Sequence, residues 1–253
     1  MARTPPPPQR NPLIPFYVIL GLVALVGVGL LARSLSRHRG GTAATEPVPV
    51  NVSPEEIART PGIPMGSADA PVTILEFADF QCPHCAEWAT FIEPLIREKL
   101  IKPGIVRYVY HEFPLGGAFR HSFLAARAGR CANEQGKFWP YHDLLFARQP
   151  DWTGLDDPTD FFIDLAGQAG LDKGPFEQCL ESDKYADIVS RNRALGVQLG
   201  VQGTPTLFIN GKRIEQLPSD FTTLEAIVMR EAGRAPAADS AADSASAPAD
   251  TGQ

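Results

Sequence analysis

The segment that most constrains the fold is an apolar run that leads directly into two closely spaced cysteines. Residues 72–80 are mostly branched and aromatic, which predicts a buried strand. Cys82-Pro83-His84-Cys85 follows at once, and a helix is expected over about residues 82–99. Pro94 should kink this helix, because proline removes a backbone hydrogen bond. Its apolar residues recur at helical spacing and predict one buried face, made of Trp88, Phe91, Ile92, Leu95 and Ile96.

This placement of the cysteines has a chemical reason. A thiolate, not a thiol, attacks a disulfide, and the unsatisfied N–H groups of a helix N-terminus favour Cys82 as the thiolate. His84 can add a donor or a positive charge, and Pro83 fits the first turn, where its missing N–H costs little. Two intervening residues bring Cys85 within bonding distance of Cys82. We interpret the pair as redox-active, with half of a zinc site or a purely structural disulfide as the alternatives.

The rest of the folded part predicts an α/β protein interrupted by helices. Residues 105–110 form a second strand, parallel to the first because a helix connects them. Residues 117–200 carry apolar residues at helical spacing. A strand over 206–209, the turn signal Asn210-Gly211, a returning strand over 212–214 and a helix over about 220–233 complete the chain. The order is β-α-β, a helical block, then β-β-α.

The two ends of the 253-residue chain differ from the body in composition. Residues 13–32 carry no charge and are long enough to span a bilayer, which predicts a membrane anchor after a cytosolic segment over 1–12. A cleaved signal peptide is the alternative. Residues 33–55 are expected to be a linker, 56–233 the folded body and 234–253, rich in Ala, Asp, Ser and Pro, a disordered tail. The net charge is −6 overall and −11 without the arginine-containing first 45 residues, so nucleic-acid binding is not expected.

Three separated motifs, in order, resemble one known family. Residues 72–85 resemble the active-site segment of DsbA-like thiol–disulfide oxidoreductases of the thioredoxin superfamily. Gly203-Thr204-Pro205-Thr206 resembles the cis-proline loop of that superfamily, and residues 135–139 resemble the helical insert of its membrane-tethered branch. The resemblance covers about residues 60–233 and implies a thioredoxin fold with an inserted helical domain. It also implies disulfide chemistry outside the cytoplasm, without a cofactor or a metal.

The resemblance assigns roles to individual residues. Cys82 resembles the nucleophile and Cys85 the buried resolving thiol, with Pro83 and His84 as the dipeptide that tunes them. Pro205 resembles the cis-proline that packs against the disulfide and holds substrate backbone, and Thr204 the residue that tunes the potential. Glu76 resembles a buried carboxylate that assists proton transfer. The alternatives are a solvated strand-end acid for Glu76 and an ordinary turn proline for Pro205.

The other two cysteines, Cys131 and Cys179, both lie in the helical block. They are either two buried free thiols or, as an even count in an oxidising compartment favours, a structural disulfide. The remaining histidines of the body show no metal-ligand spacing and are expected to be structural or exposed; these are His111, His121 and His142.

These observations favour an anchored oxidase that accepts electrons from the cysteine pairs of exported, folding proteins. The resemblance further implies a quinone-linked membrane oxidase of the DsbB or VKOR kind as the reoxidising partner. A reductase or isomerase, and a non-catalytic tethered chaperone module, remain the alternatives.

Overall fold

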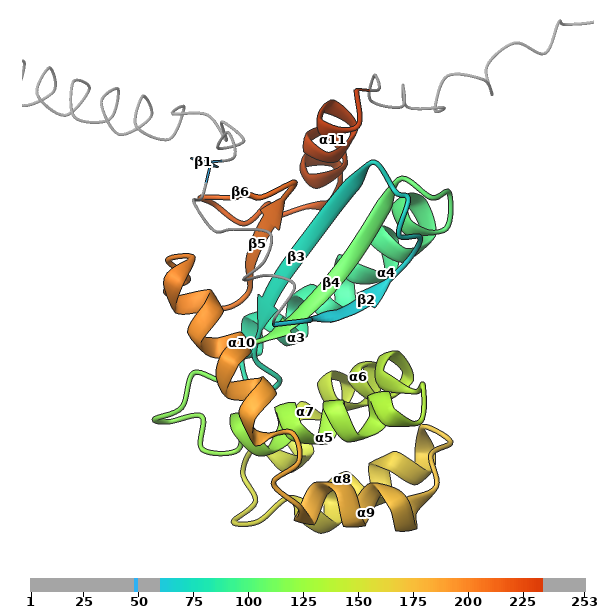
Figure 1. Ribbon diagram of the computed structural model, residues 1–253, viewed down its shortest axis with the longest axis vertical. Coiled ribbons are helices and arrows are strands. Elements are labelled where there is room, and N and C mark those ends of the chain that lie inside the picture. The colour runs from blue at the N-terminus through green and yellow to red at the C-terminus, as the bar shows by residue number, and fades with distance from the viewer. Residues whose placement is uncertain (1–47, 50–59, 234–253) are drawn as a thin grey trace, which may run out of the picture. The chain divides into compact units, whose positions relative to one another are not determined.

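The structure, a computed structural model, describes residues 48–49 and 60–233 (Figure 1). The predicted anchor over 13–32 and the predicted tail over 234–253 lie outside the described residues, as does most of the predicted linker. Among the described residues, no helix is both long and apolar enough to cross a membrane.

The centre of the fold is a mixed sheet with the strand order β1-β6-β5-β3-β4-β2. The central strand β3 pairs parallel with β4 and antiparallel with β5 (Figure 1). The parallel pair was predicted from the helical connection between the two strands. The strands are β1 (Val48–Pro49), β2 (Ile63–Met65), β3 (Val72–Ala78), β4 (Val106–Glu112), β5 (Thr206–Ile209) and β6 (Lys212–Arg213).

The hairpin between β5 and β6 forms at the predicted turn. Asn210 and Gly211 both have positive φ angles, 47° and 77°, a conformation that these two residue types tolerate best. β6 then pairs with β1, which lies within the predicted linker.

The helix after the cysteines is not continuous, which corrects the prediction of one buried face. It divides into α3 (Pro83–Phe91), α4 (Glu93–Ile96) and a π-helical turn, η1 (Arg97–Ile101). The break at Ile92, two residues before Pro94, turns the following residues about the helix axis. Phe91 is therefore 68% exposed and Leu95 38% exposed, whereas the carboxylate residue Glu93 is fully buried.

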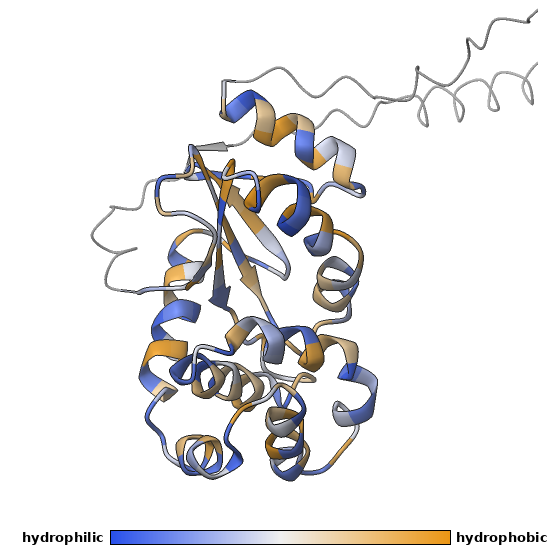
Figure 2. Ribbon diagram, turned by 90° about the vertical axis from the view of Figure 1, so that its right-hand side faces the viewer, coloured by the Kyte–Doolittle hydropathy of each residue, from blue (hydrophilic) through white to orange (hydrophobic). Residues whose placement is uncertain are grey.

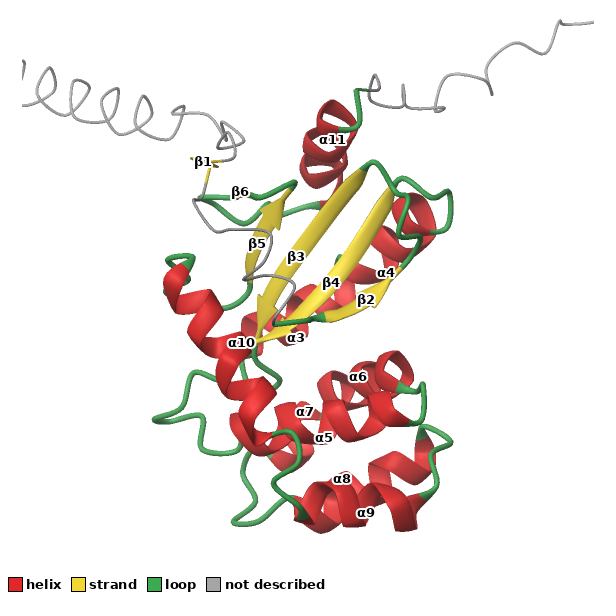
Figure 3. Cartoon of the chain, viewed as in Figure 1, coloured by secondary structure: helices red, strands yellow, loops and turns green. Residues whose placement is uncertain are grey.

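A helical insert, residues 122–198, separates β4 from β5 (Figure 3). It begins five residues later than predicted, because residues 113–121 form a loop that carries short turns. The insert consists of α5 (Ser122–Glu134), α6 (Phe138–Ala147), α7 (Gln149–Trp152), α8 (Thr159–Gln168), α9 (Lys173–Glu181) and α10 (Ala186–Gln198). The chain then returns to the sheet and ends its described part in α11 (Phe221–Glu231).

Three groups of buried apolar side chains hold these layers together. One face of the sheet packs against α3, η1 and α11, and the other face packs against α10. The third group joins the inside of the insert to Phe80, Cys82 and Cys85. Figure 2 shows hydrophobic and hydrophilic residues on both the helices and the strands. The cysteine pair therefore lies where sheet and insert meet.

Candidate functional site

The two cysteines occupy the junction between the end of β3 and the start of α3. Cys82 is the residue that precedes the first helical turn, and its backbone N–H donates to the Asp79 carbonyl over 3.0 Å. Both are free thiols in this structure. Cys82 keeps 4% of its surface exposed, whereas Cys85 is fully buried. Only Cys82 is therefore accessible to another molecule.

The two thiols differ in proton affinity. A hydrogen bond from the Cys85 thiol is the largest influence on Cys82; together with Thr204 and the backbone N–H groups of Cys85 and His84, it outweighs burial and lowers the pKa of Cys82 to about 5. Burial, followed by the hydrogen bond to Cys82, raises the pKa of Cys85 well above its ordinary value. At neutral pH the accessible sulfur is a thiolate and the buried one retains its proton.

His84 contributes to this difference through its backbone. Its ring Nδ1 lies 3.2 Å from a carboxylate oxygen of Glu87, and the side chain is 77% exposed. The sequence predicted that the imidazole could supply a donor or a charge to Cys82; in the structure, the His84 backbone N–H is one of several groups, after the Cys85 thiol, that lower the pKa of Cys82. Pro83 occupies the first helical position, where its lack of an N–H group costs nothing.

The loop before β5 lies against Cys82. The peptide bond between Thr204 and Pro205 is cis. Cys82 Sγ lies 3.4 Å from the Thr204 carbonyl oxygen, to which the thiol donates when it is protonated. The Thr204 hydroxyl is buried and forms no other hydrogen bond within the described part of the chain, so it is available to the thiolate. The structure thus brings together the two motifs that the sequence separates by more than one hundred residues.

Glu76 is a buried acid behind the cysteines, not a solvated one. It is 2% exposed, and the Tyr108 hydroxyl donates to its Oε2 over 2.8 Å, while Trp88 Nε1 donates to that hydroxyl over 3.0 Å. Burial and then the charge of Glu93 raise the pKa of Glu76 to about 8. Glu76 can therefore hold a proton at neutral pH and release it to a strong base nearby.

The sequence did not reveal two polar side chains, those of Asp79 and Gln149, that fix the turn around Cys82. The Asp79 carboxylate accepts from the backbone N–H groups of Gln81 and Leu115, each over 2.8 Å. Gln149, from α7 of the insert, donates to the carbonyls of Phe80 and Cys82 over 2.8 and 3.0 Å. A glutamine 67 residues away carries no sequence signal for such a contact.

An apolar groove of about 320 Å³ runs beside the cysteines. A second, more polar cleft of about 340 Å³ is lined in part by Thr204 and Pro205. Exposed Phe91 and half-exposed Leu217 give the groove its hydrophobic wall. The groove is lined by His84, Glu87, Trp88, Phe91, Ile92, Leu217, Pro218 and Ser219.

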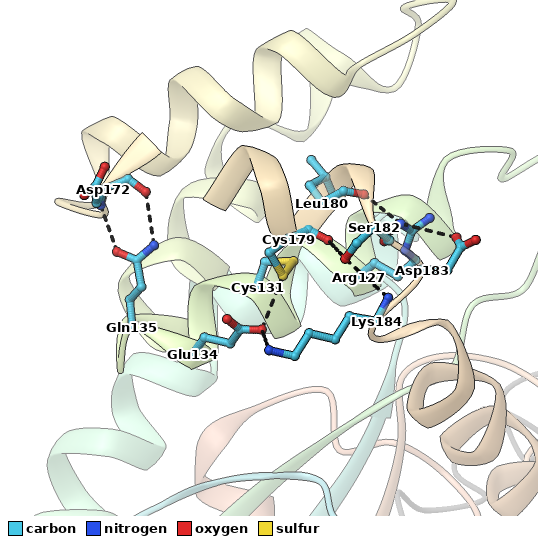
Figure 4. Close-up of a disulfide and its surroundings, with 10 residues drawn as sticks. All are labelled: Arg127, Cys131, Glu134, Gln135, Asp172, Cys179, Leu180, Ser182, Asp183 and Lys184. Carbon is cyan, nitrogen blue, oxygen red and sulfur yellow. Dashed lines mark hydrogen bonds and ion pairs between the residues drawn. A yellow bond between two sulfur atoms is a disulfide. The ribbon is translucent and has the colours of Figure 1, made fainter. Parts of the chain in front are cut away.

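Cys131 and Cys179 form a disulfide that joins α5 to α9, with Cα atoms 5.8 Å apart (Figure 4). Polar contacts surround it. Arg127 donates to the carbonyls of Leu180 and Ser182, and Lys184 pairs with Glu134 over 2.6 Å. The two cysteines are thus part of a link between helices of the insert.

The three histidines do not form a metal site. His111 Nδ1 contacts Asn192 over 2.6 Å, His121 Nε2 contacts the Leu155 carbonyl over 2.8 Å, and His142 contacts Asp143. Among the residues that the structure describes, no three metal-ligating side chains lie together.

Comparisons with known proteins agree with this geometry. The chain is 28% identical over 170 residues to disulfide bond formation protein D of Bacillus subtilis, which covers 66% of this chain and 75% of that protein. The crystal structure of oxidised BdbD from Bacillus subtilis superimposes with a TM-score of 0.64 at 26% identity, over 74% of this chain and 99% of that one.

A second kind of relative is much longer than this chain. The chain is 36% identical over 164 residues to the Na⁺/H⁺ antiporter NhaA 3 of Salinispora tropica. This match covers 65% of the chain but only 24% of the antiporter.

The sequence profile of the thioredoxin family matches residues 59–229, which is more than half of the chain. Strands β2 to β6 of the sheet, the cysteine pair at the start of a helix and the cis-proline loop beside it lie within that match. The chain therefore belongs to the thioredoxin family.

Proposed function

We propose that this protein, a thiol–disulfide oxidoreductase by its site and its relatives, oxidises cysteine pairs of other proteins through a Cys82–Cys85 disulfide. The observation that carries the proposal is the difference between its two thiols, with the pKa of Cys82 lowered to about 5 and that of Cys85 raised. A stabilised thiolate favours the reduced form, so the disulfide form is a strong oxidant.

The proposed reaction has two exchange steps. A substrate thiolate attacks Cys82 Sγ, the Cys82–Cys85 bond breaks, and Cys85 leaves as a thiolate that accepts a proton from Glu76. The second substrate thiol loses its proton to solvent and attacks the substrate sulfur of the mixed disulfide. Cys82 then leaves as a stabilised thiolate, and the substrate carries the new disulfide. Two electrons pass from the substrate to the cysteine pair.

The surroundings of Cys82 suit an extended polypeptide as the substrate. The apolar groove beside His84 and Phe91 can accept exposed hydrophobic side chains of a protein that has not yet folded. Thr204, whose carbonyl lies 3.4 Å from Cys82 Sγ, and Pro205 line a second cleft and offer backbone groups to a substrate chain. No side chain needs to recognise a particular sequence, so substrates are selected by accessible cysteines.

We place this reaction outside the cytoplasm, because cytosolic thiol systems would keep the cysteine pair reduced. The uncharged residues 13–32 would anchor the protein in the membrane, and a quinone-linked oxidase of the DsbB or VKOR kind would reoxidise it. The name of the relative from Bacillus subtilis, disulfide bond formation protein D, supports disulfide formation.

Two measurements test the direction of the reaction. Equilibration of the cysteine pair with glutathione should give a strongly oxidising potential, and the oxidised protein should form a disulfide in a two-cysteine peptide, whereas Cys82→Ser should not. A potential as low as that of a reductase would refute the oxidase proposal. Activity that persists in Cys82→Ser would refute the role of Cys82 itself.

A further inference from the structure

A second buried carboxyl group, Glu93, lies close to Glu76 behind the cysteine pair. Its side chain is 1% exposed, and its Oε1 accepts from Arg97 over 2.8 Å. Arg97 also donates to both carboxylate oxygens of Asp143, each over 2.6 Å, and Asp143 is 47% exposed. The chain of contacts therefore runs from the buried interior to the protein surface.

His142 completes this group from helix α6 of the insert. Its side chain is fully buried; its Nδ1 lies 2.9 Å from Asp143 Oδ1, and its Nε2 lies 3.6 Å from Glu93 Oε2. Neither Glu93 Oε2 nor His142 Nε2 forms a hydrogen bond with any other described atom. Two polar atoms without partners thus face each other inside the protein.

The protonation of the first nitrogen follows from Asp143. Burial raises the pKa of Asp143, but the hydrogen bonds from His142 and Arg97 outweigh burial and hold that pKa below its usual range. Asp143 is therefore a carboxylate at neutral pH and can only accept. His142 Nδ1 must carry the hydrogen that it donates to Asp143.

The second nitrogen then requires a proton as well. Without one, His142 Nε2 and the Glu93 carboxylate would both be acceptors, and two buried acceptors that face each other leave both groups unsatisfied. One proton between them converts the contact into a charge-assisted hydrogen bond after a shift of well under 1 Å. This proton balances the charges of Arg97, His142, Glu93 and Asp143.

We propose that Glu93 and His142 share one buried proton and that this pair adjusts the proton affinity of Glu76, which burial has already raised. Both act through Glu76 and are positioning residues. The pair matters to catalysis only if Cys85 must gain and lose a proton, so this inference rests on the function proposed above. The sequence-based hypothesis assigned no chemistry to Glu93 and only a structural or surface role to His142.

The charges around Glu76 support the connection. Tyr108 and Tyr110 of β4, Cys85 of α3, Glu93 of α4 and Arg97 of η1 all interact with Glu76. The negative charge of Glu93 raises the pKa of Glu76, and the positive charge of Arg97 opposes it. A proton that moves between Glu93 and His142 therefore changes how readily Glu76 ionises. Asp143 gives that proton a route to solvent.

The test follows the Glu76 carboxyl carbon by ¹³C NMR against pH in the reduced protein, with Glu76→Gln to assign the signal. Wild type should titrate near pH 8. Glu93→Gln removes the negative charge and should lower the midpoint by about 1. His142→Gln leaves Glu93 without its proton and should raise the midpoint. Glu98→Gln, whose side chain is 67% exposed on the same helical segment, should change nothing.

Equal or same-direction shifts in Glu93→Gln and His142→Gln would refute the shared proton, because general loosening of the core would act alike in both. A second measurement needs no variant: the ¹⁵N shift of His142 Nε2 should be that of a protonated or strongly hydrogen-bonded nitrogen, and the shift of a free lone pair would refute the proposal. Neither measurement requires turnover. If the protein fails to oxidise the peptide but the NMR measurements are as expected, the proposed function is refuted, whereas the shared proton of Glu93 and His142 is not.

Discussion

Two residues separate Cys82 from Cys85, yet the structure gives the two thiols opposite properties. One sits before the first helical turn, where N–H groups converge on its sulfur, and the other faces the apolar core. Position relative to the helix start, and not residue type, makes the difference. The predictions at the residue scale therefore concern the pKa values of individual side chains.

We expect alkylation of the reduced protein by iodoacetamide to follow the Cys82 thiolate. The rate should rise with pH around a midpoint of about 5, because hydrogen bonds from Cys85 and Thr204 stabilise the anion. Mass spectrometry should find the label on Cys82 alone, since Cys85 is fully buried. A midpoint near 8.5, the value of an unperturbed cysteine, would contradict the assignment.

Glu76 should make stability depend on pH. Its pKa is about 8 in the folded protein and about 4.5 when unfolded, so between these values the folded state binds more protons. The free energy of unfolding therefore loses this contribution as pH rises from about 4.5 to about 8. The Glu76→Gln variant does not lose this contribution. Its free energy of unfolding, relative to that of the wild type, should therefore increase by about 2–4 kcal/mol as pH rises over that range.

Urea unfolding of the reduced proteins at pH 5 and pH 8.5 measures this difference. Glu98→Gln serves as the control, because its exposed carboxylate should add no such dependence. A constant difference between wild type and Glu76→Gln at both pH values would show that Glu76 ionises normally.

At the scale of elements, the sequence predicted the strands and turns that depend on local residue patterns. The strand ending at the cysteines, the parallel partner strand and the Asn210-Gly211 turn all follow from periodicity or from turn chemistry. An interruption near Pro94 was expected, but its effect on burial was not: apolar spacing assumes one continuous buried face, and so it did not indicate that Glu93 is buried. The contacts of Gln149 could not be predicted either, since they depend on how the insert packs.

The disulfide between α5 and α9 belongs to this scale. The Cys131→Ala, Cys179→Ala double variant should lose about 2–4 kcal/mol of stability, because the cross-link restricts the unfolded chain. Peptide oxidation should be largely retained, since no hydrogen bond of Cys82 or Glu76 involves α9 among the described residues. Urea unfolding and an oxidation assay below the unfolding range measure both effects. Loss of activity with stability intact would instead make this disulfide part of the reaction.

At the scale of the whole molecule, the proposed location is open to a direct test. If residues 13–32 anchor the protein with its body outside, protease added to cells stripped of any outer barrier should digest residues beyond about 33. A cytosolic thiol protein in the same cells is the control and should survive until lysis. A body that is equally protected would overturn both the location and the oxidase proposal.

The exposure of only one sulfur determines the kinetics of the complete cycle. Because Cys85 is fully buried, the protein to be oxidised and the oxidant that restores the disulfide must visit Cys82 in turn. We expect ping-pong behaviour, with parallel double-reciprocal plots when the two reactants are varied. Each reactant should also inhibit competitively at high concentration, by occupying the form of the protein that the other needs. Intersecting plots would mean that both bind at once, which a single accessible sulfur does not allow.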